Sequence, residues 1–415
     1  VVDVAPEIWK RFPAIRDRSL ISMRDGSRLA RYNNAVPEEM DVFVGLFTSF
    51  VHAREQQMNE QVEAGLDLVA MGTVADMMPV LNENRILVKK GLEHIEHTSR
   101  PGLRRLLERQ KIIGRSLASK DIGWNLSPVI NATGRMGRPD KAVTLLLDEN
   151  PEDRDALIEE VIGLNRDRRR IGDDMWQRVL PGAYESRDLH HGKLVVIHDE
   201  DGHRGITGIV AGRLARMFNV PALVMIHTEG RVVGSVRSAR GFGATEFLKA
   251  MEDLLDDWGG HDAAAGFTLS TDRLQAFQGR LQEHTRELVL PETDDIAIRI
   301  DAELPLAYLR PDLEKTVAGF EPFGIDHPPI VFMARGLLLE RAEIVGKQQP
   351  GHLRLLLGGG SYKWPAVFWN AADRINSDFR EGDTVDVVFE FGKNVYKGQE
   401  SVQLTVLDVK HRAQV

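Results

Sequence analysis

The chain has 415 residues, which is enough for two or three domains, and its 42% hydrophobic and 28% charged residues are typical of a globular protein. The lack of cysteine excludes disulfide bonds, thiolate zinc sites and a cysteine nucleophile, and because neither a membrane-length apolar run nor a signal sequence occurs, we expect a cytoplasmic protein. A formal net charge of −9 excludes a surface that is basic throughout, so nucleic acid would have to bind through local patches.

The chain up to about residue 145 predicts helices around one short strand. Apolar residues at helical spacing indicate a helix over residues 40–63. The apolar run of residues 66–72 predicts a buried strand, whose tip leads into a loop that carries Asp76. Further helices are expected over residues 84–97 and 102–117 and from about Asp140, with a loop over residues 123–137.

Two stretches are rich in basic residues. Nine Lys or Arg and three Glu lie from Lys89 to Lys120, and six Arg and one Glu lie from Arg204 to Arg240. Local patches of this kind attract phosphates. A run of charges is also typical of a solvent-exposed helix face, and the counts alone do not separate the two interpretations.

The middle of the chain changes to a pattern of strands and helices in alternation. A long amphipathic stretch over residues 151–179, rich in Glu and Arg, predicts a solvent-exposed helix that connects two domains. The alternation that follows is typical of an α/β domain. Its strands are expected over residues 193–197, 222–226 and 231–235, and its helices over residues 205–218 and 244–258.

From about residue 291 the pattern is one of short strands separated by glycine-containing turns. Five or six such strands suggest a small closed barrel such as an OB-fold. The strands are expected over residues 296–300, 331–339, 352–357, 363–368, 384–391 and 401–409.

One of these strands carries a cluster of aromatic residues. Alternation along the strand would place Trp364 and Trp369 on opposite faces. Tyr362 and Trp364 are candidates for stacking on bases, and Lys363 and Lys393 for following a nucleic-acid backbone. The alternative is that the aromatic residues form the core of the barrel.

Asp76 follows the predicted strand of residues 66–72, where α/β folds place ligands. A single carboxylate in this position can equally be a helix cap. Its surroundings are more specific: residues 70–79 resemble the fourth motif of the RecJ branch of the DHH phosphoesterase superfamily, in which a strand is followed by Gly-Thr-x-Ala-Asp and then by Pro.

Five further segments resemble motifs of the same branch, in the family's order. The resemblance covers the chain from about residue 42 to its end. The segments are residues 128–137 (Asn-Ala-x-Gly-Arg), 203–214 (His-x-Gly), 234–238 (Gly-Ser-x-Arg-Ser), 259–266 (Gly-Gly-His) and 322–328, which is similar to the entry of the RecJ OB-fold.

The resemblance implies that Arg135 binds phosphates near a metal site and that Ser235 and Arg237 bind the 5′-terminal phosphate. A guanidinium group can hold two phosphate oxygens as a fork, which Lys cannot do. For any one of these arginines taken alone, the alternative is a surface ion pair. The full set of expected phosphate- or DNA-binding residues is Asn131, Gly134, Arg135, His203, Gly234, Ser235, Arg237, Ser238, Gly259, Gly260 and His261.

Glycines and histidines in this set have less direct roles. Gly234, Gly259 and Gly260 are expected to permit positive φ and to let backbone amides approach a phosphate. His261 could donate to a phosphate or hold its loop. For His203, a contact with substrate and a structural hydrogen bond both stay open.

The resemblance also implies a pair of Mn²⁺ or Mg²⁺ ions, with Asp76 as a metal ligand and Asp76 and Arg135 as catalytic residues. The superfamily's first three motifs, an Asp-x-Asp pair, a further Asp and Asp-His-His, do not occur in this sequence. One carboxylate cannot hold two ions, so we expect the chain to bind phosphate and DNA but to cleave poorly or not at all. Because it starts with Val1, we expect the missing motifs upstream.

The fold class implied is α/β, in four parts: the C-terminal half of a DHH domain (residues 1–145), a connecting helix (146–185), a DHH-associated domain (186–290) and an OB-fold barrel (291–415). The activity implied is that of a single-stranded-DNA-specific 5′→3′ exonuclease that releases 5′-mononucleotides in recombination and DNA repair. Single-stranded DNA would be its partner, together with a single-strand-binding protein or a helicase.

Two alternative functions stay open at this point. One is a DHH phosphodiesterase for small oligonucleotides or cyclic dinucleotides, against which the OB-like strands argue. The other is a non-catalytic DNA-binding scaffold of replication or repair, against which the intact phosphate motifs argue.

Overall fold

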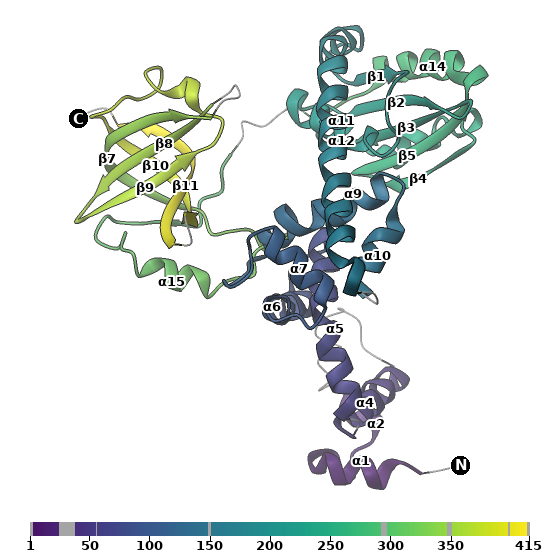
Figure 1. Cartoon of the computed structure of the whole chain (residues 1–415), viewed down its shortest axis with the longest axis vertical. Coiled ribbons are helices and arrows are strands. Elements are labelled where there is room, and N and C mark those ends of the chain that lie inside the picture. The colour runs from purple at the N-terminus through teal and green to yellow at the C-terminus, as the bar shows by residue number, and fades with distance from the viewer. Residues whose placement is uncertain are drawn as a thin grey trace. The chain divides into compact units, whose positions relative to one another are not determined.

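The computed structural model describes residues 3–24, 38–54, 56–147, 151–291, 297–346, 351–396 and 399–412. The chain divides into two compact units (Figure 1). The first comprises residues 1–99, 112–123 and 299–415, and the second comprises residues 100–111 and 124–298. None of the described helices is both long and apolar enough to cross a membrane.

The N-terminal part of the first unit is helical. Helix α5 (Gln56–Ala75) runs through residues 66–72, so the strand predicted there is wrong. It packs closely on α6 (Asn82–Glu96), where a Cβ at Gly91 would lie 2.3 Å from the carbonyl oxygen of Leu66. A short apolar run is compatible with a buried helix as well as with a strand, and this helix pair decides between them. The other helices are α1 (Ala5–Arg11), α2 (Leu20–Arg24), α4 (Glu39–Arg54) and α8 (Ser119–Asp121).

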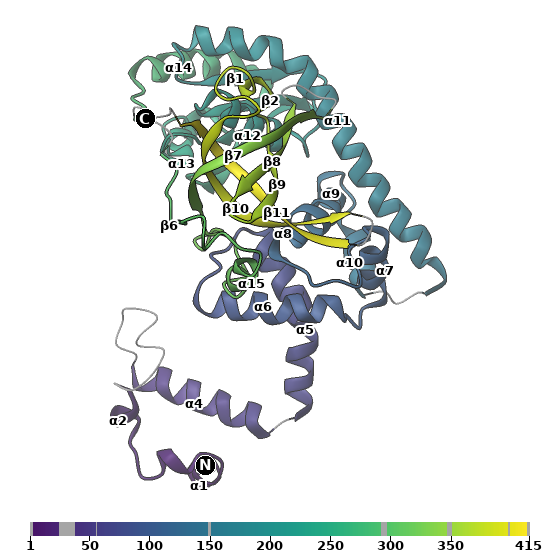
Figure 2. The same ribbon diagram turned by 90° about the vertical axis from the view of Figure 1, so that its left-hand side faces the viewer.

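A barrel forms the C-terminal part of the first unit (Figure 2). Strand β10 pairs with both β11 and β7, which closes the sheet. Closure leaves few unpaired strand edges, and the OB-like barrel expected from the sequence is confirmed. Residues 297–300 belong to no strand, contrary to prediction. The elements are β6 (Ala302–Glu303), α15 (Leu313–Ala318), β7 (Phe332–Val345), β8 (His352–Gly359), β9 (Tyr362–Phe368), β10 (Thr384–Tyr396) and β11 (Gln399–His411).

A five-stranded sheet forms the centre of the second unit (Figure 1). Its first two strands are parallel and the others are antiparallel. In spatial order the strands are β1 (Val195–Asp199), β2 (Ala222–Thr228), β3 (Arg231–Arg237), β5 (Ala264–Ser270) and β4 (Asp257–His261). The helices after β1 are α12 (Thr207–Phe218), α13 (Ala244–Lys249) and α14 (Leu274–Glu287).

Successive residues of these strands enter two different hydrophobic cores. Val195 and Val224 pack with residues of α12, whereas Leu223 and Met225 pack with residues of α13 and α14. Side chains alternate between the faces of a strand, so a sheet covered by helices on both faces needs apolar residues at every position. This arrangement confirms the predicted α/β class. The helix predicted over residues 244–258 is too long, because α13 ends at Lys249 and β4 begins at Asp257.

The connecting helix α11 (Arg154–Leu189) has 36 residues and is about 54 Å long at 1.5 Å per residue. It confirms the amphipathic helix predicted from residue 151 and continues ten residues beyond the predicted end at 179. Its buried residues, such as Met175 and Val179, recur at helical spacing. The helices that pack on it within the second unit include α7 (Pro101–Arg109), α9 (Ser127–Arg135) and α10 (Pro139–Leu147).

Candidate functional site

Ser235 and Arg237 lie near the C-terminal end of β3, on the face of the sheet that α12 covers. Both side chains are half-buried. The hydroxyl groups of Ser235 and Thr207, at the first residue of α12, are 2.9 Å apart and hydrogen-bond each other. Arg237 donates from Nη1 to the carbonyl oxygen of Val236 at 2.8 Å. The strand and the helix therefore hold a hydroxyl and a guanidinium group side by side.

Two glycines make room for this arrangement. A Cβ at Gly208 would lie 2.4 Å from Nη2 of Arg237, so the guanidinium group lies against the first turn of α12. A Cβ at Gly205 would lie 1.9 Å from the carbonyl oxygen of Arg135, at the end of α9. The N-terminus of a helix is an electropositive place where anions bind favourably. The two arginines thus converge on one end of α12.

Arg135 and Arg237 repel each other. Burial lowers the pKa of Arg237 first, and the nearby positive charge of Arg135 lowers it further. Arg135 is exposed and donates from Nη1 to the carbonyl oxygen of Gly205 at 3.4 Å. Neither arginine forms an ion pair with a carboxylate within the described part of the chain. Two like charges in this setting cost free energy unless an anion joins them, so the arrangement of the two guanidinium groups would suit an anion.

The other residues of the Asn-Ala-x-Gly-Arg motif lie on a helix. Residues 127–135 form α9, preceded by a π-helix over residues 122–126, so the predicted loop is wrong. Asn131 and Gly134 are exposed. Asn131 lies one turn before Arg135, and residues four apart share a face of a helix.

His203 is held in the turn that precedes α12. Its Nδ1 accepts a hydrogen bond from the backbone N–H of Gly205 at 3.1 Å. This contact favours the structural interpretation of His203, because it orients the segment that receives Arg135. Ser238 is likewise fixed in a turn, with its N–H donating to the carbonyl oxygen of Ala263 at 3.0 Å and its hydroxyl to that of Phe242.

The positive φ predicted for three glycines of the sheet is found at one of them. Only Gly260 has a positive φ, 138°, and a Cβ there would lie 2.5 Å from the carbonyl oxygen of Ala264. Gly234 is part of β3, and a Cβ at this position would lie 2.1 Å from the ring of Phe267. Gly259 is in β4 with open space around it. The expectation of positive φ is therefore wrong for Gly234 and Gly259. His261, the last residue of β4, is exposed.

Asp76 belongs to the first unit and follows the end of α5, instead of a strand. Its N–H donates to the carbonyl oxygen of Gly72 at 2.9 Å, and its side chain is exposed. Among the described residues, no group of three or more His, Asp or Glu could hold a metal ion. The described residues around Asp76 do not fit a two-metal centre.

The barrel residues divide into core and surface. Trp364 is 3% exposed and lies in the barrel core, so its predicted role in DNA contact is wrong and the alternative is confirmed. Tyr362 is 41% exposed, and Lys363 pairs with Glu340 at 2.7 Å. The side chain of Lys393 lies outside the described residues.

Sequence reasoning missed some residues at the start of α12 and on the surface of the barrel. Trp369 is 55% exposed, with its ring 4.9 Å from that of His352 in an edge-to-face arrangement. Thr207 and Gly208 lie inside the segment that resembles a family motif, and the spacing of Gly205 and Gly208 along it was the available signal.

Two family models match the chain, and together they cover the α/β unit and the barrel. Residues 191–287 match the DHHA1 domain, and residues 300–408 match the RecJ OB domain. Among curated relatives, the single-stranded-DNA-specific exonuclease RecJ of Bacillus subtilis is 29% identical over 371 residues, which are 88% of this chain and 46% of the relative. The enzyme of the same name from Escherichia coli is 30% identical over 354 residues, 82% of this chain and 60% of the relative.

A solved structure shares the fold. The crystal structure of RecJ from Thermus thermophilus in complex with Mn²⁺ matches with a TM-score of 0.69 and 29% identity, over 85% of this chain and 50% of that one. A structure of RecJ from the same organism with Mg²⁺ matches equally well, at 30% identity. The chain spans about half the length of these relatives. It carries their DHHA1 and OB domains, and it belongs to the RecJ family.

Proposed function

We propose that this chain is the strand-binding part of a single-stranded-DNA-specific 5′→3′ exonuclease, and that Arg135, Ser235 and Arg237 hold the 5′-terminal phosphate. The observation that carries the proposal is the pair of mutually repelling guanidinium groups at the start of α12, one of them half-buried. A terminal phosphate has more negative charge than an internal phosphodiester, so it suits this site better.

The chain's own residues would position the strand. A phosphate held by Arg135, Arg237 and the hydroxyl of Ser235 sets the register of the strand without reading its bases. The next phosphodiester bond then lies one nucleotide away, which would explain release of mononucleotides from the 5′ end. RecJ structures have been solved with Mn²⁺ and with Mg²⁺, and such ions would supply an activated water when bound.

The barrel would bind the strand farther from its end. Trp369 and Tyr362 are exposed aromatic residues on an OB domain, and stacking of a base on such a residue is worth roughly 1–3 kcal/mol. A dinucleotide would leave this surface unused, which favours long strands as substrates. Roles in recombination and repair, a single-strand-binding protein or helicase as partner and a cytoplasmic location belong to the same proposal.

The test is binding of labelled oligonucleotides with a 5′-phosphate, a 5′-hydroxyl or a 3′-phosphate, measured by fluorescence anisotropy. We expect the chain to prefer the 5′-phosphorylated strand. Arg237→Ala should remove about tenfold or more of that affinity, since a hydrogen bond to a charged group contributes roughly 1.5–3 kcal/mol. Arg231→Ala, at the exposed opposite end of β3, is the matched control. Equal binding of all three strands would refute the proposed site.

A further inference from the structure

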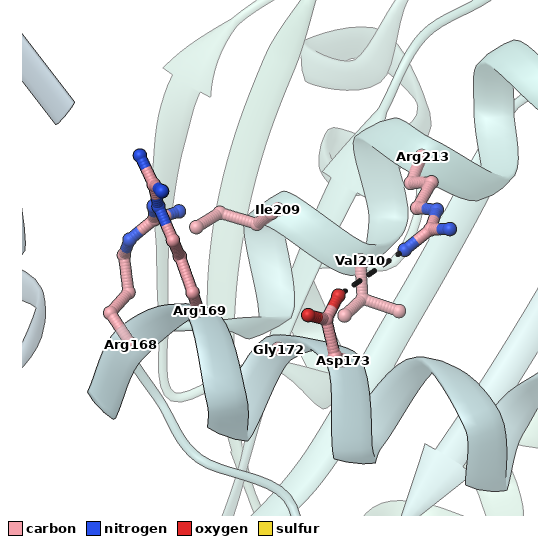
Figure 3. Close-up of a pocket in the computed structure, with 7 residues that line it drawn as sticks. All are labelled: Arg168, Arg169, Gly172, Asp173, Ile209, Val210 and Arg213. Atoms are coloured by element: carbon pink, nitrogen blue, oxygen red, sulfur yellow. Dashed lines mark ion pairs between the residues drawn. The ribbon is translucent and has the colours of Figure 1, made fainter. Parts of the chain in front are cut away.

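A pocket of about 250 Å³ lies between α11 and α12 in the second unit (Figure 3). Figure 3 shows the guanidinium groups of Arg168 and Arg169 side by side at one end of it, both rising from α11. Arg213 and Asp173 form an ion pair at the other end, with Ile209 between the two groups. The pocket therefore has two chemically different ends.

At the end with Asp173, the charges of Asp173 and Arg213 offset each other. Asp173 and Arg213 are 3.8 Å apart, and the guanidinium group of Arg213 lies 3.9 Å from the centre of the Trp176 ring. A cation held over an aromatic face and paired with a carboxylate has little left to offer a ligand. The net positive charge of the pocket therefore lies at its other end.

The end with Arg168 and Arg169 is cationic. Arg168 donates from Nε and Nη2 to the side-chain oxygen of Asn165, at 3.2 and 3.0 Å, which is a neutral partner. Burial lowers the pKa of Arg168, and the charges of Arg169 and Arg135 lower it further, against a smaller opposite effect of Asp173. Across the described residues, neither Arg168 nor Arg169 is within ion-pair distance of a carboxylate.

Arg135 links this pocket to the 5′-phosphate site. Arg135 is the last residue of α9, which packs on α11, and its Nη1 donates to the carbonyl oxygen of Gly205 just before α12. Its positive charge lowers the pKa of both Arg168 and Arg237. Arg237, Arg135 and Arg168 therefore belong to three elements of the same compact unit, β3, α9 and α11. Several cations of one unit without ion-pair partners among the described residues match the repeating charges of a nucleic-acid strand.

We propose that Arg168 and Arg169 form a second phosphate subsite, which binds an internal phosphodiester of the strand whose 5′-phosphate lies at Arg135 and Arg237. The inference rests on the proposed function. The pocket is smaller than the roughly 300 Å³ at which pockets begin to enclose small-molecule ligands, so it admits a phosphate group but does not enclose a base. Binding there is independent of sequence and fixes the direction in which the strand leaves the 5′-phosphate site.

The test uses a 5′-phosphorylated oligothymidylate in which one phosphodiester at a time is replaced by an uncharged methylphosphonate. We expect one linkage near the 5′ end at which the replacement lowers the affinity of the chain about tenfold, as for loss of one charge-assisted contact. Arg168→Gln, which keeps a hydrogen-bond donor for Asn165, should reduce the effect at that linkage to about twofold or less, and so should Arg169→Gln. The slope of log affinity against log salt should fall by about 0.7 in each variant.

Arg170→Gln is the matched control, because Arg170 is exposed, lies outside the pocket and pairs with Asp167 and Asp174 on its own helix. This variant should lose as much affinity on methylphosphonate replacement as the unmodified chain does. If both Arg168→Gln and Arg169→Gln lose as much affinity as the unmodified chain on replacement of every linkage, the proposed subsite is refuted. A different result would refute the proposed function, namely that Arg237→Ala still prefers a 5′-phosphorylated strand. Loss of one linkage effect together with a retained 5′-phosphate preference would support the subsite.

Discussion

Arg237 reaches the start of α12 because residue 208 has no side chain. A Cβ at Gly208 would lie 2.4 Å from its Nη2, well inside van der Waals contact. Gly212 lies one turn farther along the same helix, and a Cβ there would meet only ordinary contacts, at 3.7 Å from Arg216 and 3.8 Å from Arg237. Substitution of Gly208 would therefore displace Arg237, whereas substitution of Gly212 would show only the general effect of replacing a glycine in a helix.

Gly208→Ala should weaken binding of a 5′-phosphorylated single strand about tenfold without lowering the melting temperature. The added methyl group displaces the flexible end of Arg237, whereas alanine is favoured over glycine in a helix by up to about 1 kcal/mol. Gly212→Ala should change the affinity by less than about twofold. Binding is measured by anisotropy and stability by thermal unfolding; an unchanged affinity of Gly208→Ala would show that the position of Arg237 does not matter.

At the scale of elements, β9 shows what closure of the barrel does to an aromatic cluster. Trp364 points into the core, where its Nε1 is buried without a hydrogen-bond partner among the described residues. Trp369 follows the end of the strand and remains 55% exposed beside His352. Two tryptophans five residues apart thus lie in the core and on the surface of the barrel respectively.

Trp364→Ala should destabilise the barrel by about 3–5 kcal/mol, the usual cost of emptying an aromatic core site. Trp364→Phe should cost less, because it keeps a ring in the core and removes the unpaired N–H. Trp369→Ala should leave stability within about 0.5 kcal/mol but lower the affinity for long single strands by roughly 1–3 kcal/mol. Circular dichroism and anisotropy measure the two effects. A stable Trp364→Ala variant would contradict the core assignment, and unchanged DNA binding of Trp369→Ala would contradict the stacking role.

At the scale of the whole molecule, the candidate phosphate-binding arginines and Asp76 belong to different compact units. Arg135 and Arg237 belong to the second unit, and Asp76 belongs to the first. No cluster that could hold a metal occurs in the part of the chain that is described. Strand binding by this chain should then depend on arginine and on salt, and only weakly on divalent ions.

Removal of divalent ions with EDTA should change the affinity of the chain for a 5′-phosphorylated single strand by less than about twofold, because guanidinium groups make the contacts. Addition of Mn²⁺ should produce no more than slow cleavage. Anisotropy and gel analysis of the labelled strand in parallel measure both quantities. Fast Mn²⁺-dependent release of mononucleotides would mean that this chain holds a complete metal centre.

The sequence by itself determined the class of the fold, the long helix, most barrel strands and the identity of the family. Local periodicity and short motifs predict these features, because both depend only on neighbours along the chain. Arg135, Ser235 and Arg237 could be named in this way, because the motif around each is specific. The bounds of the four proposed domains remain a prediction.

Only the tertiary structure decided the rest. Residues 66–72 are helical because α6 packs on them through Gly91. The local sequence pattern does not predict this contact. Gly234 is required by the ring of Phe267 on the neighbouring strand, and Trp364 is buried because the barrel closes over it. Arg237 and Arg168 are about 70 positions apart in the sequence, and the charge of Arg135 acts on both, so these electrostatic interactions exist only in the folded chain.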